Sequence, residues 1–219
     1  MAFQDRIDAG RQLAKALLKY KERHPVILAL PRGGVPVAAE VASQLDTPLD
    51  LVIVRKIGVP MQPELAMGAV AEDDEPVRNA EVIEFSGISE RTFAEVCREE
   101  RIEIGRRRSR YLGDRPRSEI KGHVAIIVDD GIATGATTLA AIRAVRKREP
   151  KELILAVPVA PADTIERLRP EVDAIVCLET PEIFGAIGYF YRDFRQTSDD
   201  EVIAMLKRFP ANRATTPPS

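Results

Sequence analysis

The segment from Val124 to Thr138 constrains this chain most strongly. It begins with five consecutive apolar residues, which stop at two adjacent carboxylates, Asp129 and Asp130. A glycine follows, and residues 134–138 lead into a stretch with helical spacing. A short continuous apolar run that ends at a turn is typical of a strand buried on both faces of a parallel sheet. Because ligands bind beyond the carboxyl ends of such strands, the segment predicts a binding site there.

The residues after the two carboxylates suit an anion. Glycine and alanine let a ligand approach the backbone closely, and the first amides and the dipole of a helix attract negative charge. The hydroxyls of Thr134, Thr137 and Thr138 add hydrogen-bond donors. Because two carboxylates repel a bare phosphate, the ligand should also carry hydroxyls or a divalent cation. A sugar phosphate supplies the hydroxyls.

A purely structural interpretation of the same residues stays open. Asp130 or Thr134 can cap the following helix while Gly131 forms the turn. Two other phosphate motifs, GxxxxGK[ST] and GxGxxG after a strand, do not occur in the sequence. The order of strand, paired carboxylates and Thr-Gly-Ala-Thr loop is more specific than a capped turn, and it favours a phosphate site.

The rest of the chain alternates between apolar runs and helical patterns. Similar apolar runs lie at residues 26–30, 49–54, 153–157 and 174–178. The spacing of apolar residues predicts helices over residues 7–20, 35–44, 90–111, 137–148 and 163–168. Strands interleaved with helices indicate a parallel sheet covered on both faces. We therefore expect an α/β fold, a Rossmann-like doubly wound sheet of about five strands.

Two segments depart from this alternation. Gly58, Pro60 and Pro63 punctuate residues 56–80, which predicts a mobile loop followed by a hairpin. Residues 210–219 are rich in Pro, Thr and Ala without apolar periodicity, which predicts a disordered tail.

The composition favours a soluble protein without a charged polymer as its partner. The 32 Lys and Arg residues nearly balance the 34 Asp and Glu residues, so we expect neither nucleic acid nor a membrane to bind. Cys97 and Cys177 lie far apart, which favours reduced thiols over a disulfide framework. The sequence shows neither a signal peptide nor a run of roughly 20 apolar residues, so a cytoplasmic location is expected.

The run Val124 to Leu139 resembles the motif with which type I phosphoribosyltransferases bind phosphoribosyl pyrophosphate (PRPP). The resemblance implies that Asp129 and Asp130 hold the 2′- and 3′-hydroxyls of the ribose, directly or through Mg²⁺. It also implies a loop that wraps the 5′-phosphate, with Thr138 as a further hydroxyl donor. That loop consists of Ala133, Thr134, Gly135, Ala136 and Thr137.

A second segment, Leu30 to Pro36, resembles the pyrophosphate loop of the same family. In that family backbone amides, often presented by an unusual peptide geometry, meet the pyrophosphate. The resemblance places Gly33 and Gly34 at this contact and makes Arg32 its cation. A turn from a strand into a helix needs glycine in any case, so this segment alone is weak evidence for the family. It supports the resemblance because it occurs together with the first motif.

Two cations, Arg55 and Lys56, follow the predicted strand at residues 49–54. Lys56 is the candidate for a contact with the pyrophosphate, and a solvated strand end is the equally weighted alternative. In the family a mobile loop opens here and closes over the site, and Lys56 to Pro63 looks like that loop.

Related transferases also carry a small hood, made partly from the terminal segments, that stacks on the acceptor base. We expect residues 1–209 to form one domain, with a core over about 21–178 and a hood from about 1–20 and 179–209. Tyr189, Phe190 and Tyr191 can stack on a base or pack the hood against the core.

The run Arg106 to Arg110 is the sharpest cluster of charge. Glu103 can reach Arg106 or Arg107 on a helix, whereas Arg108 has no acidic neighbour three or four residues away. A solvated helix face is the favoured interpretation, and contacts with pyrophosphate, another subunit or RNA are the alternatives.

The resemblance implies a PRPP-dependent pentosyltransferase of nucleotide metabolism that uses Mg²⁺ and forms a homodimer. It would transfer 5-phosphoribosyl to a small nitrogen acceptor, with nucleobases among the candidates, and release pyrophosphate. Ala133 stands where transferases for 6-oxopurines carry an acidic residue, which disfavours that acceptor class. The alternative is a regulatory protein that binds PRPP without turnover.

Overall fold

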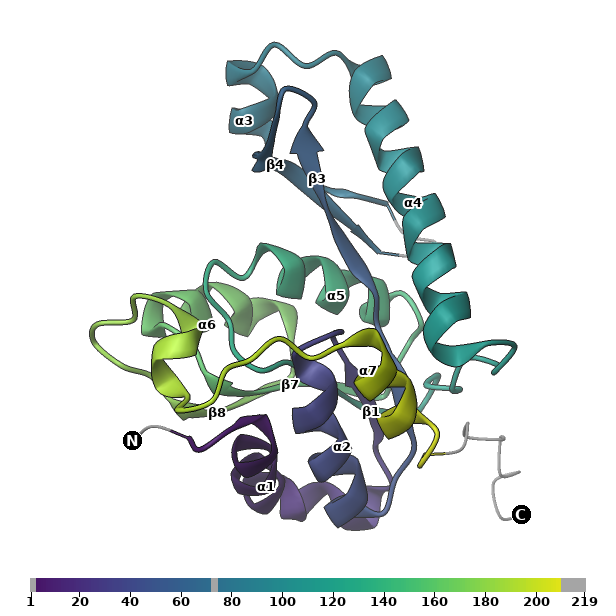
Figure 1. Cartoon of the computed structure of the whole chain (residues 1–219), viewed down its shortest axis with the longest axis vertical. Helices are drawn as coiled ribbons and strands as arrows, with labels where there is room; N and C mark the ends of the chain where they lie inside the picture. Colours follow the sequence, from purple (N-terminus) through teal and green to yellow (C-terminus); the bar gives the residue numbers. More distant parts are fainter. Residues whose placement is uncertain (1–2, 72–74, 210–219) are drawn as a thin grey trace.

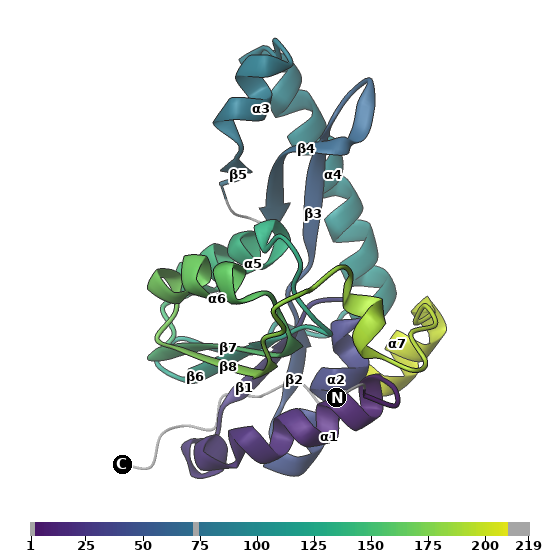
Figure 2. The same cartoon turned by 90° about the vertical axis from the view of Figure 1, so that its left-hand side faces the viewer.

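The core of the molecule is a parallel sheet. The computed structural model describes residues 3–71 and 75–209, and its central strands are β1 (Val26–Ala29), β2 (Leu49–Leu51), β6 (Val124–Val128), β7 (Glu152–Val159) and β8 (Ala174–Glu179). They lie in the order β2-β1-β6-β7-β8, and all neighbours are parallel (Figures 1 and 2). The predicted parallel sheet of five strands is confirmed, and each predicted run overlaps a strand.

Helices cover both faces of this sheet, as Figure 2 shows. On one face lie α1 (Arg6–Leu17) and α2 (Gly34–Leu45), and on the other lie α5 (Ala136–Arg146) and α6 (Ala162–Leu168). Short 3₁₀ segments follow α1 (Leu18–Arg23), follow α6 (Arg169–Glu171) and precede the C-terminal part of the chain (Ile187–Phe190). The doubly wound architecture is confirmed.

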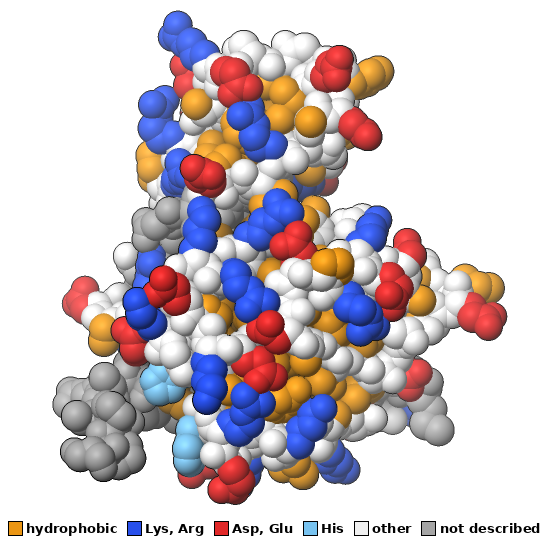
Figure 3. All heavy atoms as spheres, turned by 180° about the vertical axis from the view of Figure 1, so that it is seen from behind, with side chains coloured by type: hydrophobic (Ala, Val, Ile, Leu, Met, Phe, Trp, Pro, Cys, Tyr) orange, Lys and Arg blue, Asp and Glu red, His pale blue; other side chains and the backbone are white. Residues whose placement is uncertain are grey.

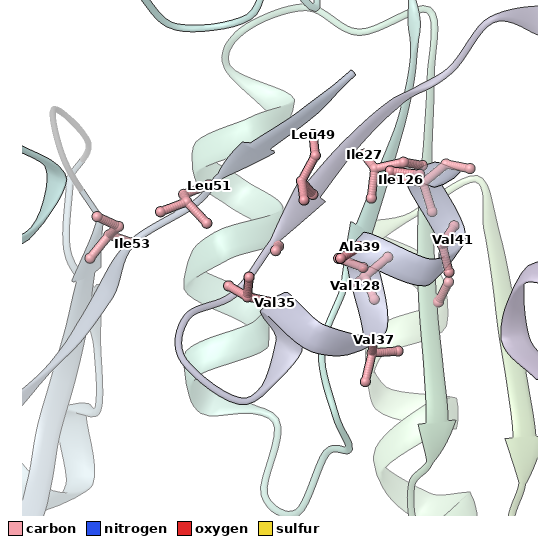
Figure 4. Close-up of a cluster of buried hydrophobic side chains, with 14 of the residues drawn as sticks. Ile27, Val35, Val37, Ala39, Val41, Leu49, Leu51, Ile53, Ile126 and Val128 are labelled. Carbon is pink, nitrogen blue, oxygen red and sulfur yellow. The ribbon is translucent and has the colours of Figure 1, made fainter. Parts of the chain in front are cut away.

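Alternate residues of each central strand enter opposite apolar layers. Ile27 and Ile126 pack with α1 and α2, whereas Leu28 and Ile127 pack with α5 and α6. Figure 4 shows part of the first layer, in which Ile27 and Ile126 lie beside side chains of α2. All four of these side chains are fully buried, which explains why β1 and β6 are apolar throughout instead of alternating with polar residues.

Residues 54–71 and 75–112 form an arm that projects from the core (Figure 1). It contains the antiparallel strands β3 (Val54–Val59), β4 (Gln62–Ala71) and β5 (Val77–Arg78), followed by α3 (Ala80–Phe85) and α4 (Glu90–Leu112). Ser89 caps the start of α4, and Gly113, at a φ of 55°, follows its end. The predicted helix over residues 90–111 is confirmed.

The loop expected from Lys56 to Pro63 is corrected by the structure. These residues belong to β3, to β4 and to the turn between them, and Lys56 pairs with Ala69 across the hairpin. The register shifts at Gly58, where a Cβ would lie 2.6 Å from the carbonyl oxygen of Pro63. The hairpin expected after residue 63 therefore begins at residue 54, and its glycine permits a close approach of two strands.

The N-terminal segment pairs with residues 190–193 beside the sheet. The backbone amide of Phe3 donates to the carbonyl of Phe190 at 2.8 Å, and Asp193 donates to Gln4 at 2.9 Å. Helix α1 itself packs against α2, and α7 (Asp199–Leu206) packs against α2 and α4. The tail predicted over residues 210–219 lies outside the described residues. No helix in the described part of the chain is both long and apolar enough to cross a membrane.

Candidate ligand-binding site

The two predicted motifs lie against each other at the carboxyl end of the sheet. Strands β1 and β6 are neighbours, and the turns that follow them converge because Leu30 donates its amide to the carbonyl of Val128 at 2.9 Å. A Cβ on Gly33 would lie 2.1 Å from Oδ2 of Asp130, and one on Gly34 would lie 2.7 Å from the oxygen of Val128. Only glycine allows this contact between the loop and the carboxylates.

The loop from Pro31 to Gly34 turns sharply into α2. The peptide bond between Pro31 and Arg32 is cis, which is an unusual peptide geometry of the kind that the resemblance implied. No side chain caps the start of α2 in the described structure, where Gly33 occupies the capping position. The beginning of α2 therefore stands directly beside the paired carboxylates.

The loop after the carboxylates leaves the start of α5 open. Gly135 precedes α5 with a φ of 75°, and no described side chain caps the helix, so neither Asp130 nor Thr134 acts as its cap. Four loop residues are exposed, namely Ala133, Thr134, Ala136 and Thr137, whereas Thr138 is buried. Uncapped amides at an exposed helix start form an anion-binding site.

Helix α6 braces the same loop from behind. The hydroxyl of Thr164 donates to the carbonyl of Ala133 at 2.9 Å, and Arg167 donates to the hydroxyl of Thr164 at 2.8 Å and to the carbonyl of Thr134 at 3.3 Å. These bonds satisfy the carbonyls of Ala133 and Thr134. Arg167 also brings positive charge to the loop, and sequence reasoning did not identify it.

The two carboxylates have different surroundings. Asp130 is 8% exposed and forms an ion pair with Arg6, whose Nε lies 2.7 Å from Oδ2. Asp129 is partly exposed, and its Oδ1 accepts the amide of Asp130 at 2.9 Å. Burial and the charge of Asp130 raise the pKa of Asp129 well above its usual range. Burial also raises the pKa of Asp130, against the opposing effect of Arg6.

A pair of carboxylates with raised pKa values is stabilised by any partner that donates hydrogen bonds or positive charge. Hydroxyl groups, a shared proton and a divalent cation all meet this requirement. Among the described residues no cluster of three or more His, Cys, Asp or Glu side chains is placed to hold a metal.

Arg32 extends from the first loop toward α7. Its Nη1 lies 3.5 Å from Oδ1 of Asp199, and its side chain is one third exposed. Asp199 also accepts a hydrogen bond from the hydroxyl of Tyr111 at 2.7 Å and pairs with Arg110 at 3.0 Å. The bond from Tyr111 and the nearby arginines hold the pKa of Asp199 below its usual value. Arg32 is therefore part of a charged cluster at the mouth of the site.

Lys56 lies in the arm, away from these contacts. Its Nζ is 3.1 Å from Oε2 of Glu64 across the hairpin, and the neighbouring Arg55 pairs with Glu100 of α4 at 2.6 Å. Among the described residues Lys56 forms no hydrogen bond with Asp129 or Asp130. Arg32 thus lies in the loop that packs against the carboxylates, with its guanidinium beside Asp199, whereas Lys56 lies in the arm beside Glu64.

The aromatic residues near the C-terminus divide into two kinds. Tyr191 is 6% exposed and donates its hydroxyl to the carbonyl of Asp130 at 2.5 Å, and burial raises its pKa. Tyr189 is 78% exposed. The ring of Phe190 stacks on that of Phe184 with centroids 5.4 Å apart. Tyr191 thus supports the site from within, and only Tyr189 of this group is free to meet a ligand from solution.

Each arginine of the run on α4 lies beside a carboxylate of the fold. Arg106 and Arg107 pair with Glu103 at 2.7 and 2.8 Å, and these bonds lower the pKa of Glu103 to about 2. Arg108 lies 3.7 Å from buried Asp50 of β2, a partner that helix spacing could not reveal. On the face in Figure 3, acidic and basic side chains are interspersed.

Comparisons with known proteins agree with this geometry. Residues 2–195 match the family model described as "Phosphoribosyl transferase domain". The chain is 49% identical over 206 residues to a Mycobacterium tuberculosis protein named "Putative phosphoribosyl transferase Rv0571c". That alignment covers 94% of this chain and 46% of the relative, so the chain spans about half the length of the relative.

A solved structure from Thermus thermophilus, of the protein TT1426, has the same fold. It matches with a TM-score of 0.82 and 39% sequence identity, over 96% of this chain and 100% of that chain. The similarity extends over the sheet and the arm together, because nearly all of both chains is included.

Proposed function

We propose that this chain, which belongs to the phosphoribosyl transferase domain family, binds PRPP and transfers its 5-phosphoribosyl group to a nitrogen acceptor with release of pyrophosphate. The observation that carries the proposal is the contact between two loops at neighbouring strand ends. One loop offers an uncapped helix start beside two carboxylates, and the other offers Gly33 and Gly34 packed against those carboxylates. A sugar that is phosphorylated at one end and pyrophosphorylated at the other matches this arrangement.

Each part of PRPP has a proposed partner. The exposed loop of residues 133–137 takes the 5′-phosphate at the start of α5, and Thr138 lines the turn behind it. Asp129 and Asp130 face the ribose hydroxyls. Arg32, with the amides of Gly33 and Gly34, faces the pyrophosphate.

Mg²⁺ fits the residues that are present. It is commonly held by one or two carboxylates together with water and substrate phosphates, and Asp129 and Asp130 supply the carboxylates. Burial and the charge of Asp130 raise the pKa of Asp129, and a cation beside the pair would favour the ionised carboxylate. Bound there, Mg²⁺ would neutralise charge on the pyrophosphate oxygens.

The chain's own residues contribute mainly by orientation. The carboxylates fix the sugar and favour the positive charge that develops on the ribose as the bond to pyrophosphate breaks. Arg32 stabilises the departing pyrophosphate. Ala133 offers no acid or base beside the acceptor, so the acceptor nitrogen must be nucleophilic by itself or be activated by another group. Lys56 remains a proposed contact only if the arm moves toward the site.

The wider organisation belongs to the same proposal. Residues 1–209 act as one domain, with residues 21–178 as its core, residues 1–20 and 179–209 as the hood, and a homodimer as the working assembly. The hydrogen bonds from Phe3 to Phe190 and from Asp193 to Gln4 support a hood built from both terminal segments.

Calorimetry with PRPP and Mg²⁺, followed by a pyrophosphate-release assay over a panel of nucleobases and small amines, tests the proposal. We expect PRPP to bind and at least one acceptor to release pyrophosphate. Binding without release across the panel would identify a PRPP-dependent regulatory protein instead. Absence of PRPP binding would contradict both functions.

A further inference from the structure

We propose that Arg6 is a positioning residue of the PRPP site, acting through Asp130. The role goes beyond the two sequence motifs, because Arg6 lies at the start of α1 and far from both in sequence. The inference rests on the proposed function, since it assigns a task within that site.

The first observation is the burial of the ion pair. Nε of Arg6 donates to Oδ2 of Asp130 at 2.7 Å, and the two side chains are only 11% and 12% exposed. Such a pair differs from a surface salt bridge, because removal of one partner leaves an uncompensated charge inside the protein. Arg6 therefore fixes the place of the buried Asp130 carboxylate.

The second observation is that Arg6 is itself held by the C-terminal segment. Its Nη1 donates to the carbonyl of Arg195 at 2.8 Å, and its guanidinium carbon lies 3.9 Å from the centre of the Phe194 ring. A planar guanidinium can make both hydrogen bonds and the ring contact at once, whereas an ammonium group cannot. The position of Arg6 is thus determined from two sides.

The same segment grips the backbone of Asp130. The hydroxyl of Tyr191 donates to the carbonyl of Asp130 at 2.5 Å, and the ring of Phe3 lies 5.4 Å from the ring of Tyr191. Side chain and backbone of Asp130 are therefore both bound by residues from the two ends of the chain. One ion pair would be enough to neutralise the carboxylate. The additional bond from Tyr191 to the backbone also fixes the position of Asp130.

The held oxygen also faces the pyrophosphate loop. Oδ2 of Asp130 occupies the space where a Cβ of Gly33 would be, so a rotation of the carboxylate would change its contact with that loop. By fixing this oxygen, Arg6 sets both the direction of the carboxylate toward the ribose and the spacing between the two binding loops. Arg6 need not touch PRPP to have this effect.

A double-mutant cycle measured by Mg²⁺–PRPP calorimetry tests the inference. The proteins are wild type, Arg6→Gln, Arg6→Lys, Asp130→Asn and the double variant Arg6→Gln/Asp130→Asn. Arg11→Gln is the matched control, because Arg11 is on the same helix and pairs with Glu40 while 61% exposed. Thermal unfolding is recorded for every variant.

We expect Arg6→Gln to weaken PRPP binding about tenfold, and Arg6→Lys, which keeps the charge, to weaken it only about threefold. In the Asp130→Asn background the same Arg6→Gln change should alter affinity less than about twofold, because its target is gone. Arg11→Gln should bind as wild type does. The intermediate effect of lysine separates the charge of Arg6 from the fixed geometry of its guanidinium. The loss of effect without Asp130 distinguishes positioning from a general loss of stability.

An equal effect of Arg6→Gln with and without Asp130 would overturn the inference, as would unchanged binding by Arg6→Gln. If Arg6→Gln does not fold, Arg6→Lys alone and with Asp130→Asn supplies the same comparison. Wild-type protein that fails to bind PRPP would reject the proposed function, and the inference with it. If only the inference about Arg6 is wrong, wild-type protein still binds PRPP. The two failures are therefore distinguishable.

Discussion

At the scale of single residues, Asp129 and Asp130 show that neighbours in sequence can have separate tasks. Asp130 is buried and paired with Arg6, whereas Asp129 is partly exposed and accepts a hydrogen bond from the amide of Asp130. The exposed member of the pair is the better placed to meet a ligand. Direct contact with the sugar should therefore depend most on Asp129.

The change Asp129→Asn tests this assignment. We expect it to weaken Mg²⁺–PRPP binding at least about tenfold, because a neutral amide replaces a charged acceptor. Asp173→Asn is the control, since Asp173 precedes β8 at the opposite end of the sheet and pairs with Arg146. Calorimetry on both variants is the measurement. Equal affinities for Asp129→Asn and wild type would remove Asp129 from the ribose site.

The site residues that the sequence predicted and those it did not predict differ in how far away their partners lie in the sequence. Asp129, Asp130 and the loop after them are local, since one strand end and one helix start place them together. Arg6 pairs with Asp130, which is 124 residues away in sequence, and no sequence periodicity predicts such a pair. Arg108 is a similar case, because its partner Asp50 lies on a different element.

At the scale of elements, the central strands and most helices follow from local pattern, and the exceptions have physical causes. Pro60 and Gly58 made residues 56–63 resemble a loop, yet the glycine serves a bulge inside a hairpin. Helix α7 was not predicted, although Ser198 and Glu201 form a capping box that the sequence displays. The eight residues of α7 show little apolar periodicity, so the capping box was the only local indication of a helix there.

The capping box of α7 allows a prediction at this scale. Ser198→Ala should lower the free energy of unfolding by about 1 kcal/mol, because the side chain of Ser198 satisfies the amide of Glu201. Hydrogen exchange should increase mainly within α7. Ser109→Ala, at an exposed position inside α4, should leave stability nearly unchanged. Denaturant unfolding with exchange measurements checks both, and unchanged protection of α7 in Ser198→Ala would contradict the role of the cap.

At the scale of the whole molecule, one buried carboxylate joins the arm to the core. Asp50 of β2 is fully buried, accepts the amide of Ser118 at 2.7 Å and lies 3.7 Å from Arg108 of α4. The long helix of the arm is thereby tied to the edge strand of the main sheet. The same helix carries Tyr111, which holds Asp199 and hence the neighbourhood of Arg32.

Asp50→Asn should therefore destabilise the protein as a whole. We expect a loss of about 3 kcal/mol in the free energy of unfolding, because the buried arginine loses its opposite charge. Glu103→Gln is the matched control on α4, and its exposed pairs should be worth less than about 1 kcal/mol. Urea titrations of both variants give the comparison. A loss for Asp50→Asn no larger than that of Glu103→Gln would show that the link contributes little.

The pairing of Phe3 with Phe190, and of Arg6 with Asp130, has a practical consequence for anyone who dissects this protein. A fragment trimmed to the first strand would retain every strand of the sheet and both sequence motifs, but it would lose α1, whose Leu13 and Leu17 are fully buried in the core. It would also lose Arg6, the partner of Asp130. Tags, fusions and deletions near residue 6 should accordingly be treated as alterations of the site, not as neutral changes at a chain end.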